Sequence, residues 1–377
     1  MEHAADIAIV GAGILGLAHA YVAAKLGYRV VVFERSPRAA GASIRNFGMI
    51  WPIGQSPGPM HQMAVQSRSL WLEILQAARM HYRATGSLHL AYRADEAAVL
   101  KEFSEVGPRT GYECQWQTPE QVLSRSQAVK PDGLLGGLWS PLEFTVDPRH
   151  VIAQMPVFLE AQYGVTFCFG TAVNHVEPPF LQAGGETWRA LRVVICSGDD
   201  FETLYPRFFK NSGITRCKLQ MMRTCVQRDE WRLGPSLAAG LTLRFYPSFG
   251  ICRSLPALAK RIVQETPELE DWQIHVLVSQ TADGAITLGD SHQYGLAVDV
   301  FDRMDIDRLI ERYAAGFLRL PEWRIVERWH GVYAKHPKEP FISIAPAEGV
   351  RIVNAPGGSG MTLAFGLAEH TSAVSSW

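Results

Sequence analysis

The chain has 377 residues, of which 47% are hydrophobic and 19% are charged, and its formal net charge is -1 at pH 7. This length exceeds one typical hydrophobic core and therefore predicts two domains. The balanced charge gives no electrostatic reason to expect nucleic acid or an anionic membrane surface as a partner.

The six cysteines form no CxxC pair and no zinc-ligand spacing, which predicts free thiols and no metal site. No apolar run approaches the ~20 residues that a membrane span needs, and the N-terminus lacks the pattern of a secretory leader. We therefore expect a soluble, cytoplasmic protein. The sequence makes no prediction of oligomeric state.

The N-terminal segment combines two strand patterns with a glycine turn, a helix and an acidic residue. Residues 7–10 form an apolar, β-branched run, and a GxGxxG motif follows directly at residues 11–16. A helix is predicted at 17–26 and a second strand at 28–33, and Glu34 stands at the end of that strand. This order is typical of a domain that binds a dinucleotide.

Each glycine of the turn has a physical task. Gly11 permits the tight turn, Gly13 lets the backbone approach a pyrophosphate, and Gly16 allows the helix to pack closely against the strand. The helix N-terminus offers free N–H groups to phosphate, and Glu34 accepts hydrogen bonds from ribose hydroxyls. The unit by itself does not distinguish FAD from NAD.

The next segment, GASIRNFGMIW at residues 41–51, stands where an NAD-binding fold usually continues into a crossover helix. It resembles the GxSxRNxG loop of the D-amino-acid oxidase, glycine oxidase and sarcosine oxidase superfamily, in which this loop runs along the FAD pyrophosphate. Further segments resemble motifs of the same superfamily in the same order. They are VDPR at 146–149, GTAVNHVE at 170–177, VVICSG at 193–198, DGAITLGD at 283–290 and APGGSGMT at 355–362.

The resemblance implies an α/β fold with a Rossmann-like FAD-binding domain and an α+β substrate domain built on a large mixed or antiparallel sheet. The FAD-binding domain would combine residues 1–80, 147–212 and 327–377, and the substrate domain residues 81–146 and 213–326. Local patterns add strands at 216–227, 241–246 and 273–279 and helices at 60–79 and 305–318.

The resemblance also implies which residues hold FAD. Val173 corresponds to the valine whose backbone meets the adenine, and residues 357–362 bring a helix N-terminus to the flavin, which favours negative charge on the reduced ring. The cysteine that carries covalent flavin in monomeric sarcosine oxidases is replaced by Gly331 here, so we expect non-covalent FAD. The implied cofactor-binding residues are Gly11, Ala12, Gly13, Ile14, Leu15, Gly16, Glu34, Arg35, Ala42, Ser43, Arg45, Asn46, Phe47, Gly48, Met49, Val173, Ser197, Gly198, Gly331, Gly357, Gly358, Ser359, Gly360, Met361 and Thr362.

The stretch WHGVYAKHP at residues 329–337 departs from two branches of the superfamily. Glycine oxidase-like relatives bind the substrate carboxylate with an arginine, and this chain has Tyr333 at that position. The carboxylate-binding lysine of sarcosine oxidases falls at Thr362. Lys335 and His336 supply cationic groups instead, and a phosphonate, with up to two charges and three acceptor oxygens, calls for several such donors.

The combination of GASIRNFGMIWPIGQ, QMMRT and GVYAKHP resembles FAD oxidoreductases of aminophosphonate catabolism, which implies a modified 2-aminoethylphosphonate as substrate. Alternatives remain open: Lys335 and His336 could be a solvated loop pair, and Arg223 could neutralise a buried carboxylate. The implied substrate-binding residues are Lys335, His336, Arg223, Met49, Trp51 and Gln55, and the implied catalytic residues are Tyr246, Tyr333 and Lys335.

The resulting prediction is an FAD-dependent amine oxidase. Hydride passes from the carbon beside the amine nitrogen to flavin N5, water hydrolyses the imine to a phosphonoacetaldehyde-like product and an amine, and O2 becomes hydrogen peroxide. A lysine near N5 often promotes the oxygen reaction in such enzymes, and Lys335 and Lys218 are both candidates; an electron acceptor other than O2 stays open. The rival functions are an oxidase of glycine- or sarcosine-like amino acids, an NAD-dependent dehydrogenase, and a nucleotide-binding module without redox chemistry.

Overall fold

The computed structural model describes residues 3–228 and 230–374. Within these residues the strands form an eight-stranded sheet, a nine-stranded sheet and a small three-stranded sheet. All six cysteines are free thiols. None of the helices in the described ranges is both long enough and apolar enough to cross a membrane.

The eight-stranded sheet is built around the N-terminal strand. β1 (Ala4–Val10) pairs in parallel with β2 (Val30–Glu34) on one side and with β12 (Glu186–Ile195) on the other. Its central residues Ile7 to Ile9 are buried because helices and strands cover both faces of a parallel sheet. The remaining strands are β9 (Thr166–Phe169), β10 (Val173–Glu177), β11 (Phe180–Ala183), β19 (Ile342–Ala347) and β20 (Val350–Asn354).

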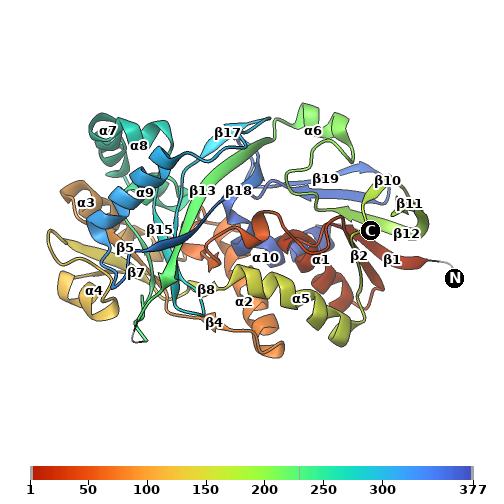
Figure 1. Cartoon of the computed structure of the whole chain (residues 1–377), viewed down its shortest axis with the longest axis horizontal. Coiled ribbons are helices and arrows are strands. Elements are labelled where there is room, and N and C mark those ends of the chain that lie inside the picture. Colours follow the sequence, from red (N-terminus) through yellow and green to blue (C-terminus); the bar gives the residue numbers. More distant parts are fainter. Residues whose placement is uncertain (1–2, 229, 375–377) are drawn as a thin grey trace.

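Four helices accompany this sheet: α1 (Ile14–Lys25), α2 (Pro59–Ala77), α5 (Pro148–Tyr163) and α10 (Gly360–Val374). Helix α10 packs against α1 and α2, and the Trp71 indole donates a 2.7 Å hydrogen bond to the Met361 carbonyl. The predicted VDPR turn does open a helix, since the Asp147 carboxylate accepts hydrogen bonds from the first N–H groups of α5. Figure 1 shows these helices in the middle of the molecule, between the second large sheet and the end that holds β1 and β2.

The nine-stranded sheet is mixed, as predicted for the second domain. Its long strand β13 (Thr215–Val226) pairs antiparallel with β16, β17 and β18, whereas β14 and β5 run parallel. The other strands are β5 (Ser87–Ala91), β6 (Gln115–Gln117), β7 (Gly136–Ser140), β14 (Ser236–Ala238), β15 (Leu277–Gln280), β16 (Ala285–Gly289), β17 (Gln293–Gly295) and β18 (Ile325–Lys335).

Helices α3 (Ala94–Val106), α4 (Pro119–Arg125), α7 (Leu255–Glu265), α8 (Pro267–Asp271) and α9 (Met304–Phe317) lie around this second sheet (Figure 1). The small sheet consists of β3 (Met49–Ile50), β8 (Phe144–Val146) and β4 (Tyr82–Arg83). Helix α6 (Pro206–Ser212) precedes β13. Single 3-10 turns are η1 (Ala42–Ile44), η2 (Pro52–Gly54), η3 (Pro108–Thr110), η4 (Gly240–Arg244), η5 (Pro247–Ile251) and η6 (Gly357–Ser359).

The predicted strand at 241–246 is wrong, because residues 240–244 form the 3-10 helix η4. Leucine alternates with polar residues there, which imitates a strand, but Thr242 is buried together with Leu241 and Leu243. The Thr242 N–H donates to the Ala239 carbonyl at 2.9 Å and closes a turn. The alternation of leucine with polar residues therefore does not mark one buried face of a strand, because residues on every side of this short helix are buried.

The other predicted elements are confirmed with small shifts of their ends. Helices at 60–79 and 305–318 correspond to α2 and α9, and the strand at 216–227 corresponds to β13. The strand predicted at 273–279 is only partly right, since β15 begins at Leu277. Gln273 closes the turn after α8 with a positive φ of 44°, which is incompatible with a strand.

The division into two discontinuous domains stays a prediction. Except for its first two residues, strand β18 lies inside the segment 327–377 that was assigned to FAD binding. It nevertheless pairs with β13 of the second sheet along most of its length. After β18 the chain returns to the first sheet through β19 and β20. The chain therefore passes from the second sheet to the first sheet just after β18. The last residues of β18 can contribute to a site that is formed by both sheets.

Candidate functional site

A cavity of about 1260 Å³ is lined by residues from both large sheets. Ordinary ligand pockets measure roughly 300–1,000 Å³, so this cavity is large enough for a dinucleotide together with a small substrate. Most of the predicted cofactor residues line it. These are Gly11, Gly13, Ile14, Leu15, Glu34, Arg35, Ala42, Ser43, Arg45, Asn46, Phe47, Val173, Ser197, Gly198, Gly331, Gly357, Gly358, Ser359, Gly360 and Met361.

The glycine turn between β1 and α1 is too tight for a side chain at Gly11 and Gly16. Gly11 has a φ of 101°, and a Cβ atom there would lie 2.5 Å from the Cys196 carbonyl oxygen. A Cβ atom at Gly16 would lie only 1.8 Å from the Gly11 carbonyl oxygen. Gly16 does not line the cavity. Glycine is therefore needed at this position because it lets α1 pack closely against the turn.

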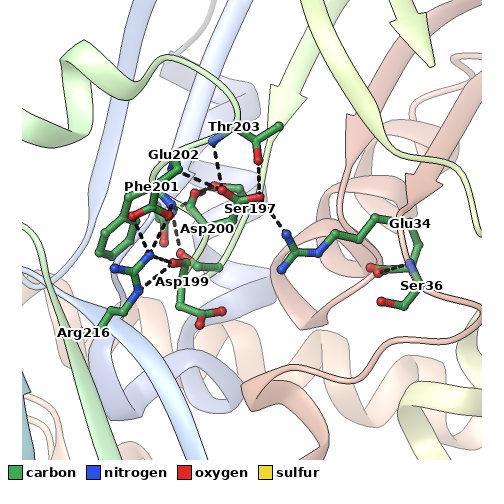
Figure 2. A network of polar contacts seen from close by, with 12 residues as sticks. Glu34, Ser36, Ser197, Asp199, Asp200, Phe201, Glu202, Thr203 and Arg216 are labelled. Atoms are coloured by element: carbon green, nitrogen blue, oxygen red, sulfur yellow. Dashed lines mark hydrogen bonds and ion pairs between the residues drawn. The ribbon is translucent and has the colours of Figure 1, made fainter. Parts of the chain in front are cut away.

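The Glu34 carboxylate ends β2 at the cavity wall. One oxygen accepts from the Ala12 N–H at 3.0 Å and the other from the Ser36 N–H at 3.0 Å. Figure 2 shows Glu34 folded over Ser36 in this way. These two bonds fix the carboxylate in place and leave lone pairs for hydroxyl donors, as ribose recognition requires.

The loop after β12 forms the neighbouring wall. The Asp200 carboxylate accepts from the Thr203 hydroxyl at 2.7 Å (Figure 2). It also accepts from the Arg35 guanidinium at 2.8 Å. Burial opposes ionisation of Asp200, but these hydrogen bonds and the charge of Arg35 outweigh it and lower its pKa. The same loop is held from the other side by Arg216, which binds Glu202 and the Asp199 carbonyl. Ser197 and Gly198 are therefore presented to the cavity by an ordered turn.

The second predicted cofactor loop is tied to the helix α1. The Ser43 hydroxyl accepts from the Ile14 N–H at 2.9 Å, beside the position that a Cβ atom of Gly13 would occupy. The Asn46 side chain bonds the backbone of Ala42, Ser43 and Gly48, so it shapes the loop and does not extend toward a ligand. The loop thus closes over the N-terminus of α1, where free N–H groups and the helix dipole favour a pyrophosphate.

Ala12, Gly48, Met49 and Thr362 were also predicted to contact the cofactor, but they do not line the cavity. Gly48 is packed against the Val146 carbonyl. The Thr362 hydroxyl accepts from the Trp51 N–H at 2.9 Å, which joins the start of α10 to the end of the loop at residues 41–51.

Strand β18 carries three residues predicted for the reaction centre. Because side chains alternate across a strand, Gly331, Tyr333 and Lys335 share one face, and all three line the cavity. A Cβ atom at Gly331 would approach the Arg45 carbonyl oxygen to 3.2 Å, so the loop and the strand nearly touch. Burial raises the pKa of Tyr333 well above its usual value, so its hydroxyl stays protonated and available as a donor.

Lys335 is a cation without an acidic partner among the residues that the structure describes. Its ammonium lies 3.2 Å from the Tyr294 hydroxyl and 4.9 Å from the centre of that ring. No carboxylate of the described residues lies within ion-pair distance of it. Lys218, the other lysine considered for the oxygen reaction, is buried, lies outside the cavity lining and pairs with Asp302 at 3.0 Å.

The structure does not support His336 as a charged ligand for substrate. Its Nδ1 accepts from the N–H groups of Lys338 and Glu339 at 3.2 and 2.7 Å. Nε2 therefore carries the proton and donates to the Ser212 carbonyl at 3.0 Å. His336 borders the cavity, but both of its ring nitrogens shape the loop.

Arg223 does not reach the cavity at all. Its guanidinium pairs with Asp283 at 2.6 Å and donates to the Thr281 hydroxyl, so it neutralises a carboxylate on the second sheet. Among the aromatic and amide candidates, Gln55 and Tyr246 line the cavity, and the Gln55 amide donates to Ser359 at 3.2 Å. Trp51 is buried behind them, 6.3 Å from the Tyr246 ring, and does not line the cavity.

Sequence reasoning missed three cavity residues, His275, Asp290 and His292, which are buried and lie close together. Asp290 and His292 follow the buried strand β16 at a spacing of two, and polar residues directly after a buried strand are a signal that could have marked them. Nothing in the sequence places His275 beside them, because that contact depends on the pairing of β15 with β16.

Comparison with known proteins agrees with this geometry. The model of the DAO family, described as FAD dependent oxidoreductase, matches residues 6–374. The glycine oxidase of Geobacillus kaustophilus is 27% identical over 210 residues, which cover 52% of this chain and 55% of that protein. The chain thus spans about half the length of this curated relative.

Two solved structures share the fold over nearly the whole chain. The crystal structure of glycine oxidase from Geobacillus kaustophilus superposes with a TM-score of 0.77 at 20% identity, covering 98% of this chain and 94% of that one. L-alpha-glycerophosphate oxidase from Mycoplasma pneumoniae, solved with FAD bound, gives a TM-score of 0.75 at 18% identity and covers 100% and 96% of the two chains. At these identities the likeness concerns the fold.

Proposed function

Because the chain belongs to the DAO family of FAD dependent oxidoreductases, we propose that it is an amine oxidase acting on an N-methylated or hydroxylated 2-aminoethylphosphonate. FAD, the cofactor of this family, would supply the acceptor for the hydride that leaves the carbon beside the amine nitrogen, with O2 taking up the electrons as hydrogen peroxide. Water then hydrolyses the imine to a phosphonoacetaldehyde-like aldehyde and a free amine.

The arrangement of the cavity residues in this chain is suited to binding FAD. The turn leaves no space for a side chain at Gly11 or Gly16, and Glu34 is fixed with free lone pairs beside it. The start of α10, preceded by the glycines of η6, opens on the same cavity and presents a second helix N-terminus. Gly331 offers no thiol for a covalent bond, which supports a dissociable cofactor.

The observation that carries the phosphonate proposal is Lys335. It is a cation in the cavity wall without an acidic partner in the described part of the chain, and it stands two residues from Tyr333, where relatives place a carboxylate-binding arginine. A protonated tyrosine and an ammonium provide separate donors for several oxygens, in contrast to the planar fork of arginine that matches a carboxylate. Such donors suit a tetrahedral, doubly charged group.

A second candidate is an oxidase of glycine- or sarcosine-like amino acids, which the similarity to glycine oxidase favours. Lys335 alone would then hold the carboxylate. The other two hypotheses, an NAD-dependent dehydrogenase and a nucleotide-binding module without redox chemistry, have no support from the family. We also propose that O2 is the electron acceptor. We propose that Lys335, and not Lys218, is the lysine beside the reacting centre.

Steady-state turnover with competing amines tests the proposed substrate. Peroxide and aldehyde formation are measured with N-methyl-2-aminoethylphosphonate, sarcosine and glycine, using one preparation of purified protein. We expect kcat/KM to be at least about tenfold higher for the phosphonate, because binding groups that match one anion are left unpaired by another. Equal or better turnover of sarcosine would contradict the phosphonate proposal and favour the second candidate.

A further inference from the structure

Three buried polar side chains converge in the cavity wall, apart from the glycine loops. His275, Asp290 and His292 are only 6%, 4% and 9% exposed. Their nearest nitrogen and oxygen atoms all lie within 4.8 Å of one another. The Asp290 carboxylate oxygen Oδ1 is 3.3 Å from His275 Nε2 and 3.9 Å from His292 Nε2. A cluster of this kind is costly to bury unless something completes its hydrogen bonds.

The hydrogen bonds already made leave acceptors pointing at the cluster. His292 Nδ1 lies 3.1 Å from the Gln273 carbonyl, which only accepts, so this nitrogen carries the proton of the neutral ring. His292 Nε2 is then a lone-pair acceptor beside Asp290. Within residues 3–228 and 230–374, Asp290 Oδ1 makes no hydrogen bond, and neither does His275 Nδ1.

The two imidazoles are held in place by stacking. The Phe245 ring lies 4.3 Å from the His275 ring and 5.6 Å from the His292 ring, and the two imidazoles are themselves 5.1 Å apart and nearly parallel. Stacking on both sides restricts rotation of the rings. The arrangement is therefore preorganised: it holds a carboxylate oxygen and the lone pair of His292 Nε2 in place, with the His275 ring stacked beside them.

The charges around the cluster select its ligand. Burial lowers the pKa of both histidines and raises that of Asp290, so the cluster carries at most one negative charge. Lys335 and the Arg244 guanidinium, which is bound to Glu270, add positive potential at His275. The other titratable groups that sense Asp290 are Tyr246, Tyr294, Tyr333 and Cys217, all of which stay neutral because burial raises their pKa.

A divalent metal would place two positive charges beside these fixed cations. An ammonium brings one positive charge and up to three N–H donors, which suits the unpaired Asp290 oxygen and the lone pair of His292 Nε2. The anionic end of the same molecule then meets Lys335. The cavity thus contains one site for each charge of a zwitterion.

We propose that His275, Asp290 and His292 form the amine subsite of this cavity, which binds the ammonium group of the substrate and takes its proton before oxidation. This inference rests on the proposed amine oxidation, but not on the identity of the anion. In the step, an N–H bond of the ammonium breaks and an O–H bond forms on the Asp290 carboxylate. The electron pair stays on nitrogen, so the neutral amine is ready to lose hydride from its neighbouring carbon.

Asp290→Asn tests this role, since it keeps the size of the side chain and removes the proton acceptor. We expect kcat/KM to fall at least about 100-fold while the flavin content stays at the wild-type level. In the wild-type protein, kcat/KM should decrease as the pH falls through the raised pKa of Asp290, because the carboxyl becomes protonated. This acidic limb should be lost in the variant. Asp283→Asn is the matched control, because Asp283 lies outside the cavity lining, and it should keep the wild-type profile.

His292→Gln provides an independent test if Asp290→Asn does not fold. This variant should raise KM at least about tenfold with less effect on kcat. It should also weaken the binding of methylammonium, which is measured by the change in the flavin spectrum. The inference is overturned if both variants keep wild-type kinetics. It is also overturned if a chelator removes activity and Zn²⁺ alone restores it, which would make the cluster a metal site. These assays use whichever amine the protein oxidises. A preference for sarcosine would therefore contradict the proposed phosphonate substrate, but the amine subsite could still be tested with sarcosine.

Discussion

Lys335→Met is expected to raise KM for N-methyl-2-aminoethylphosphonate by about 10- to 100-fold, with an unchanged flavin content. A hydrogen bond to a charged group contributes about 1.5–3 kcal/mol, and about 1.4 kcal/mol corresponds to a factor of ten. The ammonium of Lys335 contacts the Tyr294 hydroxyl and ring and forms no ion pair with any described residue, so its charge is available to the substrate anion. Initial-rate kinetics together with the ratio of visible flavin absorbance to protein absorbance measure both quantities.

Arg223→Met is the matched control for this prediction. It removes a positive charge from the second sheet, but Arg223 is bound to Asp283 and does not reach the cavity. KM should therefore stay at the wild-type value in this variant. A normal KM in Lys335→Met, or an equal increase in both variants, would show that Lys335 does not bind the anion.

Gly16→Ala is expected to abolish flavin binding, leaving less than about a tenth of the wild-type flavin in the purified protein. The added Cβ atom would lie 1.8 Å from the Gly11 carbonyl oxygen, so the turn between β1 and α1 would have to move. In the proposed site the turn and the start of α1 would hold the pyrophosphate through backbone groups, which a side-chain change elsewhere cannot restore. Visible absorbance of the purified protein gives the flavin content directly.

Gly316→Ala, in the helix α9, controls for the substitution itself, because nothing lies within 4 Å of the added atom. This variant should stay fully loaded with flavin. Wild-type flavin content in Gly16→Ala would contradict the assignment of the glycine turn to the cofactor.

Much of the cofactor half could be predicted from the sequence because its recognition is local. The tight turn at Gly11 and the close approach at Gly16 each demand glycine at a fixed place, so the pattern carries the geometry. The helices α2 and α9 and the strand β13 were also predictable, since each has a long and regular pattern.

The substrate half was less predictable because it is assembled from segments far apart in the chain. Arg223 and His336 have the charge or the hydrogen-bonding groups that binding a substrate anion requires. In the fold, however, both are bound to residues far away in the sequence. Conversely, His275 and Asp290 meet only through the pairing of β15 with β16. Tertiary contacts of this kind leave no periodic signal in a single sequence.

Anaerobic mixing of the flavin-loaded protein with an amine tests the central claim most directly, because it separates substrate oxidation from the reaction with oxygen. The visible flavin absorbance should bleach rapidly with N-methyl-2-aminoethylphosphonate, and the rate should saturate at a lower concentration than with sarcosine. Bleaching that is faster with sarcosine or glycine, or that does not occur with the phosphonate, would contradict the account.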